Sequence, residues 1–268
     1  MPTTFTPLKS PSSFRKLAAG MWRAPNDPTI YGTMDVEATR LLAFLDEARA
    51  AGKKLTVTHV VVRAVALALQ KHAELNAKVR FWGKLELRDT VDVFVQVSTE
   101  GGRDLSGVRI ERADEKSVDA IADEIGKTAK GVREGADRTY EKSRGMLRSM
   151  PWWMTRFFVW LSSFLVNELH FHLPKLGMPR DPFGSAMVTN VGMFGIDTAF
   201  APFTPIGRCP ILLLVPEVRQ RPWVEDGQVV ARPILRLCAT FDHRIIYGYH
   251  AGLLARTVQE LLADPEKL

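Results

Sequence analysis

The sequence predicts an α/β fold in which a mixed β-sheet packs against helices. Valine occupies every second position from Val91 to Val97, and this period of two is typical of a half-buried strand. Residues 58–72 are mostly apolar, which indicates a helix buried on most of its faces. Three further apolar runs are typical of strands, at residues 187–191, 211–215 and 234–240. Strands and helices that alternate along the chain in this way favour an α/β architecture.

The other elements follow in chain order. A first strand closes at Thr33–Met34, and apolar spacing predicts a helix over Glu37–Ala50 with a glycine just past its end. The same spacing predicts a helix over Ser117–Lys130. Near the C-terminus, a turn at Glu225–Gln228 joins two strands as a hairpin, and a closing helix is predicted over Tyr249–Ala263.

Composition and charge narrow the class of protein. The chain has 268 residues, of which 46% are hydrophobic and 25% charged, enough to bury one sizeable core. Cys209 and Cys238 lie in apolar segments and are expected to be buried thiols rather than a disulfide. The N-terminus shows no secretory pattern, so the cytoplasm is the expected compartment. Eight basic and four acidic residues between 133 and 180 account for +4 of the net charge of +6, so a nucleic-acid partner is not expected.

The segment from Ala239 to Gly248 has the most distinctive arrangement of side chains. His243 stands between Asp242 and Arg244, directly after an apolar strand and before the glycine that lets the chain turn into the closing helix. A histidine held at such a junction can present one ring nitrogen to a cavity, which a general base requires. The alternative is a structural histidine that bonds to the neighbouring carboxylate. The pattern of residues alone leaves both open.

These residues resemble the DHRxxDG signature of the acyltransferase (E2) components of 2-oxoacid dehydrogenase complexes, which are relatives of chloramphenicol acetyltransferase. Other matches follow in the family's order over about 220 of the 268 residues: Ser12–Ala18, Val60–Ala77, Ala113–Ile125, Val188–Gly195, Phe203–Ile206 and Arg221–Pro222. The resemblance implies a chloramphenicol-acetyltransferase-like mixed-sheet sandwich with flanking helices. It also implies that residues 1–268 form a single E2-type catalytic domain.

The resemblance further implies a reaction and the residues that perform it. In the family, acyl groups pass between coenzyme A and the dihydrolipoyl arm of a partner domain. His243 matches the general base, and Thr189 matches the hydroxyl, usually a serine, that stabilises the oxyanion. Thr189 could also be an ordinary β-branched strand residue. No residue is assigned to binding coenzyme A. The residues expected to support the site are Asp242, Arg244, Tyr247, Arg15 and Asn190.

The resemblance also bears on partners. In the family the histidine and the hydroxyl come from different subunits of a trimer, so a homotrimer or higher homo-oligomer is expected, with a lipoyl-bearing protein as a candidate partner. Only about a dozen residues precede Arg15, so the chain is expected to lack a lipoyl domain, a peripheral-subunit-binding domain and a lipoyl attachment site. Acyl groups would then come from another protein's arm, or from free acyl-CoA with a different acceptor. No metal is expected, since His170 and His172 have no cysteine or acid pair nearby.

One residue departs from the family signature. Tyr247 occupies the position of an aspartate, sometimes an asparagine, that fixes the geometry around the histidine and can pair with a basic residue, here matched by Arg15. A tyrosine, whose reference pKa is about 10, cannot neutralise Arg15 at neutral pH. Two hypotheses follow. A site rebuilt around tyrosine remains a CoA-dependent acyltransferase with a thiol acceptor, or an impaired site leaves an E2-like scaffold or assembly protein.

A Trp-rich, basic insertion separates two of the family motifs. It spans residues 135–183, is expected to be helical, and holds three of the six tryptophans in the run from Trp152 to Val166. Fifteen helical residues would span about 22 Å, short of the ~30 Å hydrocarbon core, and Arg156 lies among them, so a transmembrane helix is not expected. The basic residues before the run suit a helix in a membrane interface, and hence a peripheral membrane protein. The favoured interpretation is a helical hairpin against the core or a sister subunit, because such aromatic residues also anchor protein interfaces. Either contact is expected through residues 150–173.

Overall fold

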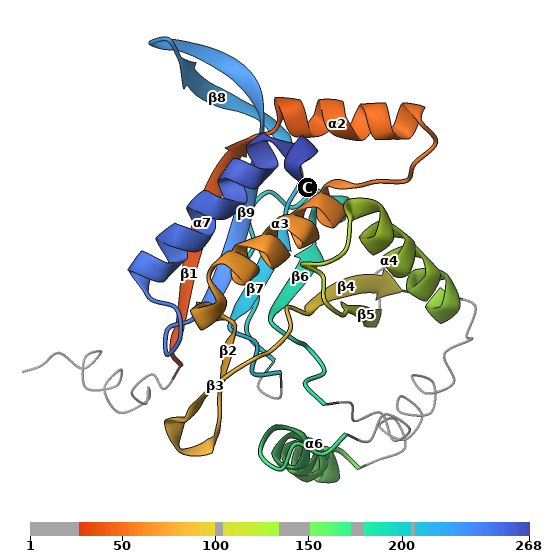
Figure 1. Cartoon of the computed structure of the whole chain (residues 1–268), viewed down its shortest axis with the longest axis vertical. Helices are drawn as coiled ribbons and strands as arrows, with labels where there is room; N and C mark the ends of the chain where they lie inside the picture. The colour runs from red at the N-terminus through yellow and green to blue at the C-terminus, as the bar shows by residue number, and fades with distance from the viewer. Residues whose placement is uncertain (1–26, 100–103, 134–150, 173–179, 205–206) are drawn as a thin grey trace, which may run out of the picture.

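A mixed sheet of seven strands forms the centre of the fold within the residues that the computed structural model describes, which are 27–99, 104–133, 151–172, 180–204 and 207–268 (Figure 1). The strands are β1 (Thr29–Glu37), β4 (Val93–Thr99), β5 (Asp104–Ile110), β6 (Ala186–Asn190), β7 (Ile211–Val215), β8 (Arg219–Glu225) and β9 (Gln228–Asp242). Their order is β1-β9-β7-β6-β4-β5, with β8 paired to β9. The β4–β6 and β6–β7 pairs are parallel and the others antiparallel, which confirms the predicted mixed sheet.

Helices cover one face of this sheet. They are α2 (Thr39–Ala50), α3 (Val57–Lys71), α4 (Val118–Arg133) and α7 (Gly248–Ala263). α3 and α7 lie side by side across the sheet, with α4 next to α3 and α2 at the end where α7 finishes (Figure 1). Nine of the 15 residues of α3 are buried, which confirms the prediction of a helix covered on most of its faces. The main core therefore lies between this helical layer and the sheet.

Two element boundaries differ from the prediction for a physical reason. β1 continues past Met34 to Glu37, which pairs with Ile234 of β9, so the next helix starts at Thr39 and not at Glu37. The Glu37 carboxylate instead accepts the backbone N–H of Thr39 at 3.0 Å. β9 extends the predicted strand at 234–240 to 15 residues, because β8 pairs with its first part and β1 and β7 pair with the rest.

The opposite face of the sheet carries a smaller apolar cluster. Met187, Leu212 and Leu214 alternate with residues of the main core and so point to this second face. Cys209 and Cys238 are buried there as free thiols, as predicted. Burial raises the pKa of the Cys209 thiol to about 12, so it stays protonated at neutral pH and acts as a small apolar side chain.

A smaller layer lies at one end of the molecule, below the main sheet (Figure 1). It contains the two-stranded sheet of β2 (Ala77–Val79) and β3 (Leu85–Leu87), and the helix α6 (Trp152–Asn167). α6 confirms that the insertion is helical at its centre, whereas residues 135–150 and 173–179 of the same segment lie outside the described residues. Across the described ranges, no helix combines the length and the apolar character needed to cross a bilayer.

Candidate functional site

The loop that carries His243 is fixed through its backbone. β9 ends at Asp242, and the chain turns through residues 243–246 before α7 begins. The His243 N–H donates to the carbonyl of Pro28 at 2.8 Å, and the Ile245 and Ile246 N–H groups donate to the Asp242 carbonyl at 3.0 and 2.9 Å. Both isoleucines are buried, whereas the His243 side chain is exposed. The turn therefore holds the histidine's backbone while leaving its ring accessible.

Asp242 pairs with Arg244 at this turn. Asp242 is 7% exposed, and its carboxylate accepts the backbone N–H of Arg244 at 3.0 Å and hydrogen bonds from the guanidinium Nε and Nη2 at 2.9 and 2.6 Å. This bonding raises the pKa of Arg244. Within the described residues, the carboxylate bonds to the arginine and not to the His243 ring. The structural alternative, a histidine held by its neighbouring carboxylate, is therefore not what the geometry shows.

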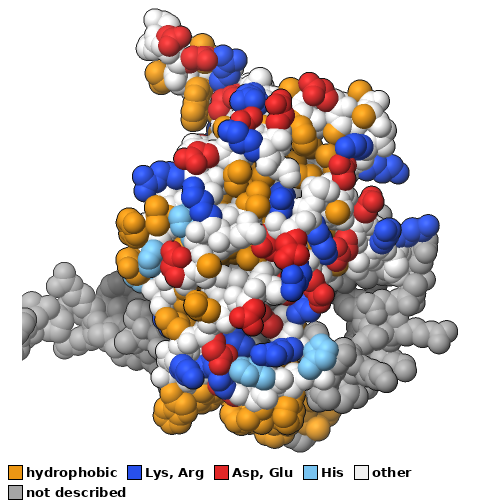
Figure 2. Space-filling view, in the orientation of Figure 1, with side chains coloured by type: hydrophobic (Ala, Val, Ile, Leu, Met, Phe, Trp, Pro, Cys, Tyr) orange, Lys and Arg blue, Asp and Glu red, His pale blue; other side chains and the backbone are white. Residues whose placement is uncertain are grey.

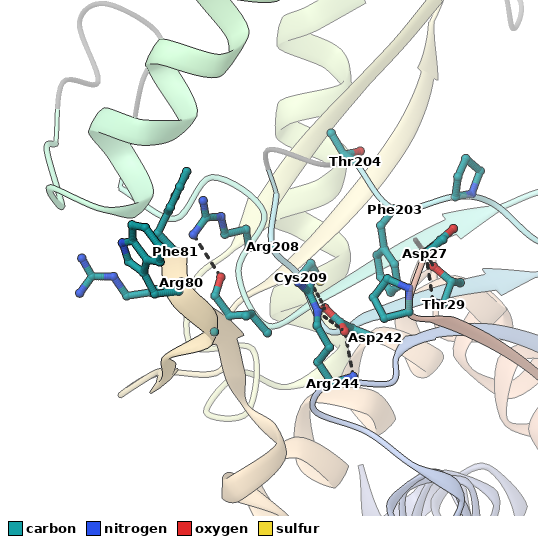
Figure 3. A pocket seen from close by; sticks show the side chains of 15 residues that line it. Asp27, Thr29, Arg80, Phe81, Phe203, Thr204, Arg208, Cys209, Asp242 and Arg244 are labelled. Carbon is teal, nitrogen blue, oxygen red and sulfur yellow. Dashed lines mark hydrogen bonds and ion pairs between the residues drawn. The ribbon is translucent and has the colours of Figure 1, made fainter. Parts of the chain in front are cut away.

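A cleft of about 660 Å³ lies beside this turn (Figure 3). Its walls come from four parts of the chain, within residues 27–29, 79–83, 202–209 and 242–244. In Figure 3, Phe81 and Arg208 stand on one side and Phe203 on the other, with Asp242 and Arg244 between them. Both sequence neighbours of His243 line the cleft, whereas His243 itself is not among the lining residues.

Thr189 and Asn190 lie at the end of β6, where they border a second cavity of about 460 Å³. Thr189 is half-buried. The Asn190 side chain donates from Nδ2 to Thr58 Oγ1 at 2.8 Å and accepts the Met193 N–H at 3.2 Å. It thereby ties β6 both to α3 and to the turn that follows, and so supports the position of Thr189.

His59 lines the same cavity and was not predicted as a site residue. It stands three residues after Thr56, the N-cap of α3, and its Nδ1 accepts the Thr56 N–H at 3.2 Å in a capping box. Burial lowers the pKa of His59, so the ring is neutral at neutral pH, with its proton on Nε2. A sequence signal for His59 exists. Thr56 is followed three positions later by a polar residue at the start of an apolar helix, which is the spacing of a capping box.

The structure does not bring Thr189 and His243 together within one chain. Thr189 lies level with Leu214 of β7, which lies level with Cys238 of β9. His243 is five residues further along, on the order of 16 Å away at roughly 3.3 Å per strand residue. The hydroxyl and the imidazole therefore occupy opposite ends of the sheet.

Tyr247 is the N-cap residue of α7 and is half exposed. Its ring lies against His250, with the ring centroids 4.0 Å apart. Arg15, the basic residue matched to the aspartate that Tyr247 replaces, lies outside the described residues. Over the ranges that the structure describes, no three potential metal ligands gather. His170 instead bonds to Glu86 at 3.0 Å, and His172 accepts the Arg180 N–H at 3.1 Å.

The sequence of this chain is similar to those of known proteins across most of its length. The model of the family described as 2-oxoacid dehydrogenases acyltransferase (catalytic domain) matches residues 9–146 and 182–268. The acetyltransferase component of the pyruvate dehydrogenase complex of Zymomonas mobilis is 27% identical over 245 residues, 90% of this chain and 46% of that protein. The Bacillus subtilis component is 28% identical over 87% of this chain and 44% of its own length. The chain thus spans about half the length of the curated relatives it matches.

Solved structures show the same fold. A probable dihydrolipoamide acetyltransferase from Listeria monocytogenes has a TM-score of 0.66 at 21% identity, covering 97% of this chain and 94% of its own. The Azotobacter vinelandii dihydrolipoamide acetyltransferase (E2p), studied for the catalytic roles of a serine, a histidine and an asparagine, has a TM-score of 0.64 at 22% identity over 98% and 99%. A chloramphenicol acetyltransferase has a TM-score of 0.50 at 16% identity, covering 88% of this chain and 89% of its own. The chain therefore belongs to the 2-oxoacid dehydrogenase acyltransferase (catalytic domain) family.

Proposed function

We propose that this chain is a CoA-dependent acyltransferase that moves an acyl group between coenzyme A and a thiol acceptor, the dihydrolipoyl group of a partner protein being the acceptor best matched by its relatives. The observation that carries this proposal is His243, held by its backbone between two residues that line the 660 Å³ cleft, with its own side chain exposed. It occupies the position of the base in the family's signature.

The chemistry needs one base and one hydrogen-bond donor. The His243 imidazole takes the proton from the attacking thiol, and the resulting thiolate adds to the thioester carbonyl carbon. The tetrahedral oxyanion accepts a hydrogen bond from the Thr189 hydroxyl. As the intermediate collapses, the C–S bond of the original thioester breaks, and the departing thiolate takes the proton from the imidazolium. No net oxidation or reduction occurs.

The site we propose is shared between two copies of the chain. The two groups lie on the order of 16 Å apart along the sheet of one chain, too far for both to reach a single carbonyl. A homotrimer or a larger homo-oligomer, in which the Thr189 cavity of one copy faces the His243 turn of the next, would unite them.

Tyr247 favours a second candidate function. It stands four residues after His243, where the family has aspartate or asparagine, and its ring packs on His250. A site impaired by that change would leave an E2-like scaffold or assembly protein. The two candidates differ in whether the Thr189 hydroxyl matters for any turnover.

Replacement of Thr189 is the experiment that tests the proposal. We expect Thr189→Ala to lower kcat for acetyl transfer from acetyl-CoA to dihydrolipoamide by about 100-fold or more, because one oxyanion donor is lost. Thr189→Ser keeps the hydroxyl and should stay within about tenfold of wild type. Steady-state rates of the three proteins decide the matter. Equal rates for Thr189→Ala and wild type would contradict the assigned role, and no turnover by wild type would favour the scaffold.

A further inference from the structure

Exposed aromatic and apolar side chains gather at the end of the molecule formed by the β2–β3 hairpin and α6 (Figures 1 and 2). Trp82, at the hairpin tip, is 97% exposed, and Leu87 of β3 is 65% exposed. On α6, Phe157 and Trp160 are 63% and 52% exposed. We call these residues, together with Phe81, the aromatic end. Folding leaves their apolar surface in water, which is unusual for side chains of this size clustered at one place.

The rings of the aromatic end form one continuous row. Trp82 and Phe81 have centroids 6.2 Å apart, and Phe81 and Phe164 of α6 are 6.1 Å apart. The row continues along α6 to Trp160 at 5.8 Å and on to Phe157 at 6.1 Å. Trp82 itself has a φ of 65°, a left-handed conformation that is unfavourable for a large side chain. The most exposed ring of the hairpin is therefore held outward by a backbone conformation that is itself unfavourable.

Glu168 makes this surface a rigid one. It follows α6 directly and is only 9% exposed. Its carboxylate accepts the Arg80 Nε–H at 3.1 Å and the Phe81 N–H at 2.9 Å, and it also pairs with Arg208. Although burial would raise the pKa of Glu168, these hydrogen bonds and charges lower it, so the carboxylate stays ionised. The helix and the hairpin are therefore joined at the base of the aromatic row.

Basic residues accompany the aromatic end in the structure and in the sequence. Lys84 is exposed beside Trp82, whereas Glu86 and Glu168 are paired with Arg80 in the interior of this layer. Along the chain, residues 138–148 shortly before α6 contain four basic residues and one acidic residue, although they lie outside the described residues. Apolar surface combined with basic residues is complementary to an anionic lipid headgroup layer.

We propose that the aromatic end binds the surface of an anionic lipid bilayer, with α6 lying in the plane of the interface and the Trp82 ring among the headgroups. The 16 residues of α6 form about 24 Å of helix, too short to cross the bilayer and suited to lying along it. Tryptophan is the residue type enriched at this depth. Because Phe81 and Trp82 also line the cleft of about 660 Å³, the contact would hold that cleft close to a membrane.

Co-sedimentation with lipid vesicles tests this proposal on the full chain. Wild type is expected to sediment with vesicles of phosphatidylcholine mixed with phosphatidylglycerol, to bind less in high salt, and to bind pure phosphatidylcholine weakly. Trp82→Gly suits the left-handed backbone and removes the ring. Combined with Phe157→Ala, it should lower the vesicle partition coefficient by about tenfold or more.

Phe200→Ala is the matched control, because Phe200 is an exposed ring outside the aromatic end, paired with Tyr31 at 5.2 Å. It should bind vesicles like wild type, and circular dichroism should show that all variants fold. The proposal is overturned if wild type does not sediment, or if Trp82→Gly/Phe157→Ala binds as wild type does. Concentration-dependent self-association that these substitutions abolish, without any vesicle binding, would assign the surface to a contact between copies instead.

Discussion

His243→Ala is expected to reduce acetyl transfer from acetyl-CoA to dihydrolipoamide by about 1,000-fold or more. The variant loses the only group at this turn positioned to take the thiol proton, and general-base catalysis by a placed histidine contributes about 10² to 10⁴ in rate. The backbone contact of residue 243 to Pro28 uses the main-chain N–H and survives the change. The variant should therefore fold and assemble like wild type. Steady-state kinetics and sedimentation velocity on both proteins check these two statements.

A second histidine serves as control for His243. His72 bonds through Nε2 to Thr257 Oγ1 at 3.2 Å, between α3 and α7 and away from the cleft. His72→Ala should leave the transfer rate within about threefold of wild type, although it removes the same imidazole. If His243→Ala transfers as fast as wild type, the histidine is not the base, and the proposed mechanism is wrong.

Gly192→Ala is expected to destabilise the fold by about 2–4 kcal/mol. Gly192 lies two residues after the end of β6, and a Cβ there would lie 2.7 Å from both the Glu217 nitrogen and the Pro216 carbonyl carbon. These are backbone atoms, so no side chain can rotate away, and the two segments must separate. Because Thr189 lies three residues before this glycine, transfer should fall as well. Urea unfolding followed by circular dichroism measures the loss of stability.

Gly195 in the same motif is the matched control. Its φ is +70°, but a Cβ there would meet no atom within 4 Å. Gly195→Ala should therefore cost about 1 kcal/mol for the left-handed backbone alone. A loss for Gly192→Ala no larger than that for Gly195→Ala would show that the close approach to Pro216 is not a constraint.

The spacing of apolar residues along the chain predicted the elements that are buried either on one face or on nearly all faces. The valines of β4 face the helical layer at every second position, the five residues of β7 are all buried, and α3 is nearly surrounded. β5 was not predicted, because Ser106, Gly107 and two charged residues interrupt its apolar pattern at the edge of the sheet. A Cβ at position 107 would lie within 2.0 Å of the Phe94 ring, so only glycine leaves room for that ring. Phe94 belongs to another strand, 13 positions earlier, so no pattern within β5 reveals why glycine stands there.

The candidate site was predictable residue by residue but not in its geometry. The motifs identify His243 and Thr189, yet their distance depends on the register of β6, β7 and β9, which no local pattern reveals. Glu168 joins α6 to Arg80, 88 positions earlier, and no sequence pattern predicts this long-range contact. Phe81 contacts Phe164 of α6, whereas the next ring, Trp82, stays 97% exposed.

Acetyl transfer by mixed oligomers tests the shared site most directly. His243→Ala and Thr189→Ala each remove one half of every site, so each alone should transfer acetyl groups at least about 100-fold more slowly than wild type. If the halves come from different copies, unfolding and refolding the two variants together at equal amounts should restore on the order of a quarter of the wild-type activity, since that share of sites receives both intact groups. Mixed oligomers that form but stay as inactive as the single variants would contradict a site built from two chains.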